Sequence, residues 1–560
     1  MPTPASSAPF RFIIVGGVAA GASAAARARR LNESASITLV ERGPDVSFAT
    51  CGLPYFIGGE IAQRDALAVQ TPQTLKALLA LDVRTGTEAI SIDRSAKRVE
   101  LRHLASGTTE WLPYDKLLLT PGAVPIRPTL PGSDDPRLFT LRSLQDMDRI
   151  KAAATTAQRV TIVGAGFIGL EMAEQFVRIG KTVTLVELTD QILPPLDAPM
   201  TRLIEDELRR HGVELVLGDS VAAFESGNPL TCRLASGRTI PADLVVLSIG
   251  VRPDTALAHT AGLALGPRGH IRVDSFLRTS DPSIYAAGDA IETDDFITHE
   301  RTAVPLGGPA NRQGRLVADH VFRCSTVQPY AGLLGTAIVR VFDAAAGLTG
   351  WTEKRLHAAH RPYHTITVND SHHAGYFPGA KPLLLKLLWN PENNRVLGAQ
   401  VTGLAGVDKR LDVIATAIAG GLTIDDLAQL ELAYAPPFGA AKDIVNLAGF
   451  TACNTRDGLV TAVDSLTDDP AAQILDVRPP SLVAAHPLPH PGAINIPLAA
   501  LRTRHGELDR ARPIVTVCAL GKTAYFAARI LAQNGFKVSA LTGGIRAHFD
   551  PLSPAKPPAP

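Results

Sequence analysis

At 560 residues the chain is too long for one hydrophobic core, and its length predicts about three to four domains. With 46% hydrophobic and 19% charged residues, the composition is typical of a soluble globular protein. The formal net charge of +1 gives no support to a nucleic-acid or anionic-membrane partner.

The cysteines and the chain ends indicate a cytoplasmic protein. The cysteines are too few and too widely spaced for a disulfide framework, which favours a reducing compartment; they are Cys51, Cys232, Cys324, Cys453 and Cys518. The first ten residues lack a basic segment and a long apolar run, so we expect neither a signal peptide nor a membrane anchor. The proline-rich end, 551–560, is expected to be disordered.

The first recognisable unit is a strand, a glycine-rich turn, a helix and a second strand between residues 10 and 41. The turn has glycine at the first and last positions of a G-x-G-x-x-G pattern, and an acidic residue closes the second strand. This order predicts a dinucleotide-binding unit, with the pyrophosphate at the helix N-terminus and the acid on a ribose hydroxyl. The residues predicted to bind this cofactor are Gly16, Val18, Ala19, Ala20, Gly21, Glu41 and Arg42.

The segment 47–59 follows this unit and carries a single cysteine, Cys51. Gly52 and Pro54 come directly after it, so we expect a sharp backbone turn just past the sulfur. A cysteine at this place is predicted to lie beside the bound redox cofactor. The alternative is a small buried hydrophobe, which is the role of most free cysteines.

A second strand–turn–helix–strand unit spans 159–187 and contains the complete glycine pattern. Two such units predict two bound dinucleotides, although a second unit can also stand empty. The acid that closes the strand, Glu187, would repel a 2′-phosphate, and no Arg or Lys follows it directly, so NADH is favoured over NADPH. The predicted binding residues are Gly164, Gly166, Phe167, Ile168, Gly169 and Glu187.

Three further strands end in glycine. Two of them, near Gly122 and Gly250, have the Gly/Pro turns expected at a crossover between domains, and both glycines are predicted to bind a cofactor. The third ends in Gly288 and Asp289, and this carboxylate is predicted to bind a ribityl hydroxyl or a pyrophosphate-bound water of a flavin. The first domain would then be completed by a later segment of the chain.

These motifs together resemble the flavoprotein disulfide reductases with two dinucleotide-binding domains, over residues 10–325. SFATCGLPYFIGG at 47–59 is similar to the single-cysteine branch, and most similar to the coenzyme A-disulfide reductases. The stretches 307–314, 373–379 and 432–438 carry the same resemblance. It implies bound FAD, a nicotinamide cofactor (NADH, or alternatively NADPH), coenzyme A as a ligand and small thiol or disulfide substrates.

The resemblance also implies a homodimer in which two tyrosines of the partner subunit face the active-site cysteine. The matching residues are Tyr376 and Tyr434, and the remaining substrate-binding residues by this match are Arg30, Ser47 and Thr50. Thr50 departs from the family, which usually has Asn before the cysteine. His372 and His373 would point to opposite faces of a strand, so we expect no metal site there.

The last part of the chain resembles a rhodanese domain. Strands at 474–478, 513–518 and 538–541 alternate with a helix that starts near Lys522, and Cys518 matches the sulfur-carrying cysteine. The usual loop has an Arg where this chain has Thr523, so Lys522 is the nearby cation. The alternative is a degenerate domain kept for packing.

The expected fold is α/β throughout, with two Rossmann-like dinucleotide-binding domains, an α+β dimerisation domain and an α/β rhodanese domain. The expected boundaries are FAD-binding 1–150, completed by 265–328; NAD-binding 151–264; dimerisation 329–452; and rhodanese 456–560.

The predicted function is an FAD-dependent reductase that uses NADH or NADPH to reduce coenzyme A disulfide, coenzyme A persulfide or polysulfide through Cys51. The alternative enzyme is an NADH oxidase or peroxidase that cycles Cys51 through a sulfenic acid. Such peroxidases usually carry a histidine in the first glycine loop, and 16–21 has none. A third possibility is a sulfur- or redox-sensing protein whose domains only bind; the intact cysteines disfavour it.

Overall fold

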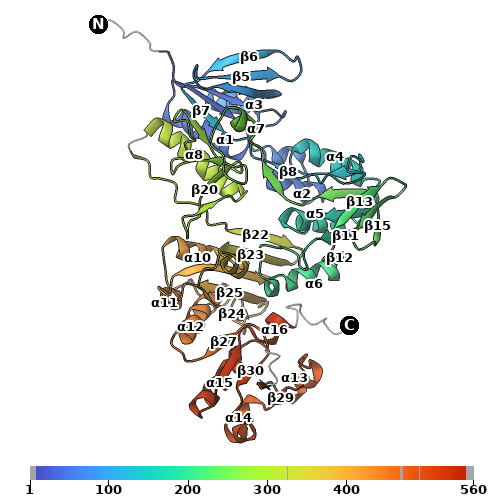
Figure 1. Cartoon of the computed structure of the whole chain (residues 1–560), viewed down its shortest axis with the longest axis vertical. Coiled ribbons are helices and arrows are strands. Elements are labelled where there is room, and N and C mark those ends of the chain that lie inside the picture. The colour runs from blue at the N-terminus through green and yellow to red at the C-terminus, as the bar shows by residue number, and fades with distance from the viewer. Residues whose placement is uncertain (1–7, 324–325, 467–470, 491, 550–560) are drawn as a thin grey trace. The chain divides into compact units, whose positions relative to one another are not determined.

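The computed structural model describes residues 8–323, 326–466, 471–490 and 492–549. Cys324 and the proline-rich end therefore lie outside the described residues. The chain forms two compact units, the first from 1–186 with 219–335 and the second from 187–218 with 336–560. Figure 1 labels the elements of both units.

The first unit is built on a five-stranded parallel sheet in the order β19-β7-β1-β2-β3. Its inner strands are short, mainly apolar runs with both faces covered, and Phe12 and Ile14 are completely buried. β19 comes from late in the chain and pairs with β7, so the sheet includes a distant segment. The strands are β1 (Arg11–Val15), β2 (Ser36–Val40), β3 (Asp82–Arg84), β7 (Lys116–Leu119) and β19 (Ile284–Ala286).

Two helices pack closely against each other beside this sheet, α1 (Ala19–Leu31) and α8 (Gly307–Arg323). A Cβ atom on Gly314 of α8 would lie 2.0 Å from the carbonyl oxygen of Ala20, so only glycine permits this approach. The other helices and 3-10 turns of the unit are α2 (Leu53–Ile57), α3 (Pro72–Leu79), α4 (Leu144–Ala154), α5 (Phe167–Arg178), α7 (Ala256–Thr260), η1 (Thr50–Gly52) and η2 (Arg64–Leu67).

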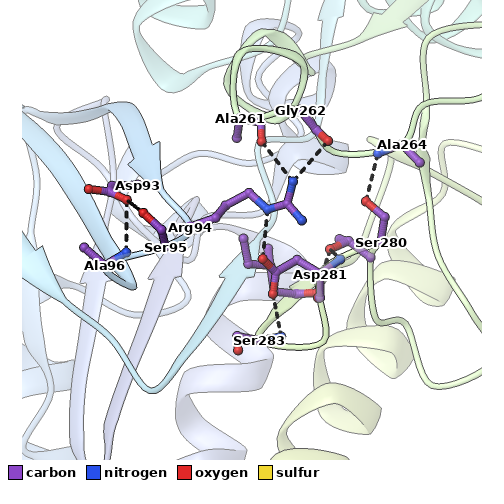
Figure 2. Close-up of polar contacts among 12 residues, drawn as sticks. Asp93, Arg94, Ser95, Ala96, Ala261, Gly262, Ala264, Ser280, Asp281 and Ser283 are labelled. Atoms are coloured by element: carbon purple, nitrogen blue, oxygen red, sulfur yellow. Dashed lines mark hydrogen bonds and ion pairs between the residues drawn. The ribbon is translucent and has the colours of Figure 1, made fainter.

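A three-stranded antiparallel sheet, β4 (Thr87–Asp93), β5 (Arg98–His103) and β6 (Thr109–Pro113), joins the early and late segments of this unit. Arg94, just after β4, extends its guanidinium to the late segment, as Figure 2 shows. Its Nε donates to Asp281 at 2.8 Å, and its Nη1 donates to the carbonyl oxygen of Gly262 at 3.3 Å. The charged bridge thus links this sheet to residues that precede β19.

A second parallel sheet of the unit contains the order β11-β10-β16-β9. Its inner strand β16 is fully apolar and buried at every position. The strands are β9 (Leu138–Phe139), β10 (Arg159–Val163), β11 (Thr182–Glu187) and β16 (Leu244–Leu247). Smaller antiparallel or mixed sheets are formed by β13 (Val221–Glu225), β14 (Leu230–Leu234) and β15 (Thr239–Ala242), and by β18 (Ile271–Arg272), β20 (Ile291–Asp294) and β21 (Arg301–Thr302).

The two expected crossover segments pair with each other. β8 (Ala123–Pro125) and β17 (Val251–Pro253) form an antiparallel ladder. The carbonyl oxygen of Gly122 accepts a hydrogen bond from the N–H of Asp254 at 3.0 Å, and that of Gly250 accepts from Ile126 at 3.0 Å. The structure therefore brings these two glycines to one short ribbon.

The second unit contains a five-stranded antiparallel sheet in the order β22-β23-β26-β25-β24. Helices α10 and α12 pack on it. Its elements are β22 (Ala337–Val341), β23 (Ala344–Gly350), β24 (His364–Ser371), β25 (Pro382–Trp389), β26 (Val396–Gly403), α9 (Glu353–Ala358), α10 (Val407–Ala419), α11 (Ile424–Gln429) and α12 (Ile444–Arg456). The earlier segment contributes η3 (Ala198–Met200), α6 (Arg202–Arg210) and β12 (Glu214–Leu217).

The C-terminal part of this unit is a parallel sheet in the order β27-β31-β30-β28-β29. β30 is buried at every position and leads directly to Cys518. The elements are β27 (Thr461–Val463), β28 (Gln473–Asp476), β29 (Ile494–Asn495), β30 (Ile514–Val517), β31 (Val538–Leu541), α13 (Pro480–Ala485), α14 (Leu498–Arg504), η5 (His505–Glu507), α15 (Lys522–Gln533) and α16 (Gly544–His548). The mixed α/β fold class is confirmed.

Across the described ranges, none of the helices combines the length and the apolar character that a membrane span requires.

Candidate active site

The first glycine loop is a tight turn between β1 and α1. Gly16 has a φ of 103°, and a Cβ atom on it would lie 2.1 Å from the carbonyl oxygen of Thr120. Gly21 is equally confined, since its Cβ would lie 1.8 Å from the carbonyl oxygen of Gly16. Val18 precedes α1, and Ala19 and Ala20 are the first two residues of this helix. The start of the helix therefore presents small side chains and backbone N–H groups to a ligand.

The acid that follows β2 belongs to the same site. Glu41 Oε2 accepts a hydrogen bond from the N–H of Gly17 at 2.8 Å, and Oε1 accepts from Gly43 at 2.7 Å. The carboxylate is therefore fixed beside the glycine loop. Its neighbour Arg42 extends to Asp254, with Nη2 3.3 Å from the carboxylate oxygen.

The turn after β19 lies at the N-terminus of α1. Gly288 has a φ of 81°, and a Cβ atom placed on it would lie 3.6 Å from the Cβ atom of Ala20. Burial raises the pKa of Asp289, the next residue, and the guanidinium of Arg142 partly opposes this shift. No described group donates a hydrogen bond to the Asp289 carboxylate. A partly buried carboxylate in this position can bind a ligand's hydroxyl group.

The second glycine loop repeats this design between β10 and α5. Gly164 has a φ of 102°, and a Cβ on Gly169 would lie 2.0 Å from its carbonyl oxygen. A Cβ on Gly166, by contrast, would meet nothing within 4 Å, so this glycine borders open space. Phe167 and Ile168 begin α5, and the Ile168 side chain is exposed.

Glu187 ends β11 and is nearly buried. Its Oε1 accepts hydrogen bonds from the backbone N–H and the hydroxyl of Thr189, both at 3.0 Å. This local ring holds the carboxylate in place at the carboxyl end of the strand, where dinucleotide riboses bind in such sheets.

These observations fit two dinucleotides. The confined first loop, the fixed Glu41 and the hydrogen-bond capacity of Asp289 suit FAD. The open face at Gly166 suits the close approach of a nicotinamide dinucleotide's pyrophosphate.

The segment with Cys51 is helical, so the expected sharp turn is wrong. Thr50, Cys51 and Gly52 form η1, which runs into α2. Gly52 has a φ of −86°, an ordinary helical value, and Pro54 occupies the first turn of α2, where its missing N–H costs no hydrogen bond. Gly52 is needed for space instead, because its Cβ would lie 2.4 Å from a methyl group of Leu67.

The cysteine segment is tied to the first glycine loop. Ser47 has a left-handed backbone with a φ of 48°, and its N–H donates to the carbonyl oxygen of Gly17 at 2.8 Å. Cys51 and Thr50 are both exposed. The solvent-accessible thiol therefore belongs to a segment that is hydrogen-bonded to the cofactor loop through Ser47.

The three arginines of α1 have different environments. Arg29 is buried and donates to several backbone carbonyls, including Ala35 at 2.9 Å, which is a structural role. Arg27 forms an ion pair with Asp319 of α8 at 2.6 Å. Arg30 is exposed and makes no hydrogen bond or ion pair with the described residues, so its predicted contact with a phosphate stays a prediction.

The second unit brings the two predicted tyrosines together. Their hydroxyl oxygens are 3.0 Å apart, and this hydrogen bond raises the pKa of Tyr376. The side chain of Tyr376 is 76% exposed and that of Tyr434 is 48% exposed, so the pair is open to a ligand or another chain. Whether they face a partner's cysteine stays a prediction.

A buried ion pair, which no sequence motif indicated, anchors the two tyrosine loops. Arg410 of α10 is 2% exposed and binds the carboxylate of Asp443, with Nη2 to Oδ2 at 2.6 Å. The same Nη2 donates to the carbonyl oxygen of His372 at 2.7 Å. Arg410 therefore joins the start of the Tyr376 loop to the end of the Tyr434 loop.

His372 and His373 come directly after the end of β24, so the premise that they lie on a strand is wrong. The ring centroids of His372 and His373 are 4.1 Å apart. Within the described ranges, no cluster of three or more His, Cys, Asp or Glu residues could hold a metal ion.

Cys518 lies at the end of β30 and is 2% exposed. Its Sγ accepts hydrogen bonds from the N–H of Gly521 at 3.1 Å and of Ala524 at 3.2 Å. Lys522 and Thr523 open α15 directly after this loop. Converging N–H groups and a helix N-terminus favour a negative charge on the sulfur.

Comparisons with known proteins agree with this arrangement. Residues 10–314 match the family model of pyridine nucleotide-disulphide oxidoreductases, 336–444 match the dimerisation domain of the same family, and 459–548 match a rhodanese-like domain.

Two similar solved structures extend over nearly the whole chain, and a curated relative covers a shorter part of it. The crystal structure described as reduced CoADR-RHD from Bacillus anthracis is 44% identical, with a TM-score of 0.93, over 96% of this chain and 97% of that one. A NAD-dependent persulfide reductase from A. fulgidus is 39% identical, with a TM-score of 0.90, over 96% of this chain and all of that one. A coenzyme A disulfide reductase from Staphylococcus aureus is 33% identical over 79% of this chain and 99% of its own length.

The chain therefore belongs to the pyridine nucleotide-disulphide oxidoreductases, a family of flavoprotein oxidoreductases, and it carries a rhodanese-like domain at its C-terminal end.

Proposed function

We propose that the protein uses NADH to reduce coenzyme A disulfide, coenzyme A persulfide or polysulfide at Cys51, and that Cys518 carries sulfane sulfur for this reaction. The observation that carries the proposal is the presence of two chemically different cysteines, an exposed one beside a dinucleotide loop and a buried one whose Sγ accepts two N–H groups. The coenzyme A disulfide and persulfide reductases among the relatives support both substrates.

Cys51 is the proposed nucleophile. Its thiolate attacks one sulfur of the disulfide, an S–S bond to Cys51 forms, and the coenzyme A thiolate leaves with a proton. Bound FAD supplies the chemistry that passes two electrons from the nicotinamide to sulfur. Tyr376 and Tyr434 of a partner subunit are proposed to donate the proton to the leaving thiolate, which requires a homodimer. The matched dimerisation domain supports this assembly.

Glu187 is proposed to select the nicotinamide cofactor. A carboxylate held at the end of β11 can accept hydrogen bonds from the ribose hydroxyls of NADH and repels the 2′-phosphate of NADPH. A kcat/KM for NADPH equal to or above that for NADH would contradict this role.

Cys518 is the proposed sulfur carrier. Its thiolate attacks the outer sulfur of thiosulfate, so that a persulfide forms and sulfite leaves, or takes a sulfur atom from a polysulfide. The covalent link between the domains keeps this sulfur near the reductase at a high effective concentration. A coenzyme A thiolate can then accept the sulfur as coenzyme A persulfide.

The test is the rate of NADH consumption by the full-length holoenzyme with each acceptor in turn. We expect coenzyme A disulfide or persulfide, or polysulfide, to be reduced much faster than oxygen or hydrogen peroxide. Faster turnover with oxygen or peroxide would instead favour the oxidase or peroxidase alternative. No turnover with any acceptor would favour a protein that only binds.

A further inference from the structure

The loop around Cys518 directs backbone N–H groups inward and carbonyl groups outward. Two outward carbonyls are capped from within the same domain. The carbonyl oxygen of Cys518 accepts from the N–H of Ile545 at 2.9 Å, and that of Ala519 accepts from Arg546 at 3.0 Å. Helix α16 therefore fixes the first half of the loop.

The next carbonyl is contacted from outside the rhodanese-like domain. Asn369 lies on β24 of the antiparallel sheet, and its Nδ2 reaches the carbonyl oxygen of Leu520 at 3.4 Å. The same Nδ2 donates to the carbonyl oxygen of Gly543 at 2.6 Å. The side-chain amide of Asn369 thus joins the loop after Cys518 to the turn at Gly543.

The orientation of this amide is determined by its surroundings. The Oδ1 atom of Asn369 is buried and has no hydrogen-bond partner among the described residues. Rotation of the amide by 180° would place Oδ1 against two carbonyl oxygens, which is repulsive. Asn369 therefore acts at this contact as a donor.

The contact to Leu520 matters because of peptide geometry. The carbonyl of Leu520 and the N–H of Gly521 belong to one planar peptide group, so fixing one fixes the other. Gly521 has a φ of 91° and no side chain, which leaves this peptide sterically easy to rotate. Its N–H is one of the two groups that point at the sulfur of Cys518.

We propose that Asn369 is a positioning residue for the sulfur site of Cys518: it holds the Leu520–Gly521 peptide so that the N–H of Gly521 faces the sulfur. The sulfur site is then completed by a strand of the neighbouring domain. A separate contact joins the same strand to the rhodanese-like domain without involving Asn369, Leu520 or Gly521: the hydroxyl of Thr542 donates to the carbonyl oxygen of Thr367 and accepts from its N–H, both at 2.8 Å. The biological use of this device rests on the proposed sulfur-carrying role.

The test measures how fast Cys518 of the full-length holoenzyme reacts with methyl methanethiosulfonate across a pH series, by mass spectrometry of its peptide. The thiolate attacks the methylthio sulfur of this reagent, so that a methyl disulfide forms and methanesulfinate leaves, and no sulfane sulfur is needed. With Asn369→Ala we expect the rate at pH 7 to fall about tenfold, the effect of one lost hydrogen bond to a charged group. The limiting rate at high pH should stay the same, because the thiol remains equally accessible.

Two control variants separate positioning from packing. Thr365→Ala removes a hydroxyl of the same strand whose hydrogen bond, among the described residues, lies within the sheet, to the carbonyl oxygen of Leu387. Thr542→Val removes the contact to Thr367 and keeps Asn369. Both should react at the native rate at pH 7. An unchanged rate in Asn369→Ala, or an equal fall in Thr542→Val, would overturn the proposal.

The failure of this proposal and that of the proposed function are distinguishable. If native Cys518 never gains sulfur from polysulfide, the carrier role fails. The reaction with methyl methanethiosulfonate still reports whether Asn369 orients the loop.

Discussion

The two cysteine sites are built on opposite principles. The sulfur of Cys518 is buried and accepts hydrogen bonds from two backbone N–H groups of its own loop. Cys51 is exposed, and no described group donates a hydrogen bond to its sulfur. The chemistry of Cys51 must therefore depend on what binds next to it, whereas Cys518 carries its own anion site.

Replacing Cys51 should give the largest effect. Cys51→Ser removes the nucleophile, so NADH-dependent turnover of coenzyme A disulfide should fall by about three orders of magnitude or more. FAD content and reduction of the flavin by NADH, both measured by absorbance, should persist. Cys232→Ser, at a buried cysteine remote from the cofactor loops in sequence, is the matched control. Full turnover in Cys51→Ser would refute the reductase mechanism.

Replacing Cys518 should abolish sulfur transfer and leave the reductase activity intact. In Cys518→Ala we expect loss of sulfur transfer from thiosulfate or polysulfide to a thiol, because the persulfide has no carrier. Reduction of coenzyme A disulfide should persist, as measured by NADH consumption. Equal loss of both activities would show that the two sites are not separable.

Weakening the anchor of the tyrosine loops should have an intermediate effect. Complete removal of Arg410 would leave Asp443 buried without its ion pair, at a cost of about 3–5 kcal/mol, so the informative variant is Arg410→Lys. Lysine keeps the charge and loses the planar fork that joins the two loops. We expect about tenfold slower turnover of coenzyme A disulfide with unchanged FAD content.

The control for this prediction is Arg395→Lys, at an exposed arginine of the same domain. Native turnover in Arg410→Lys would show that the ion pair supports folding alone. Unchanged sulfur loading of Cys518 in the same variant would further separate the two sites.

The smallest expected effect concerns coenzyme A recognition. Arg30→Ala should raise the KM for coenzyme A disulfide about fivefold, since an exposed arginine is suited to bidentate contact with a phosphate. The KM for inorganic polysulfide should not change. Lys76→Ala, at an exposed cation of α3, is the matched control. An equal rise for both acceptors would contradict phosphate binding by Arg30.

Local patterns predicted much of the fold. Apolar runs, glycine turns and closing acids identified both dinucleotide units because these motifs are contiguous in sequence. The prediction of a sharp turn after Cys51 was wrong. Gly52 and Pro54 also suit the start of a helix, and the pattern alone does not distinguish a turn from a helix start.

The contacts between distant segments were not predictable in this way. Arg410 occupies a helix position like any other charged residue, and only the fold places Asp443 and the carbonyl of His372 beside it. Asn369 belongs to no motif of the rhodanese-like domain, and its contact with Gly543 joins residues that are far apart in the sequence. Such sites require the tertiary structure, because residues far apart in sequence supply the two sides of each contact.

The central claim is that sulfur held on Cys518 is reduced through Cys51. Its most direct test is mass spectrometry of the Cys518 peptide after polysulfide treatment, before and after addition of NADH with coenzyme A. The account predicts one extra sulfur on Cys518, which coenzyme A removes. In the native protein, one NADH is oxidised and one sulfide is released for each sulfur removed. In Cys51→Ser, this NADH oxidation and sulfide release do not occur. Absence of added sulfur on Cys518, or NADH oxidation that is equal in Cys51→Ser, would contradict it.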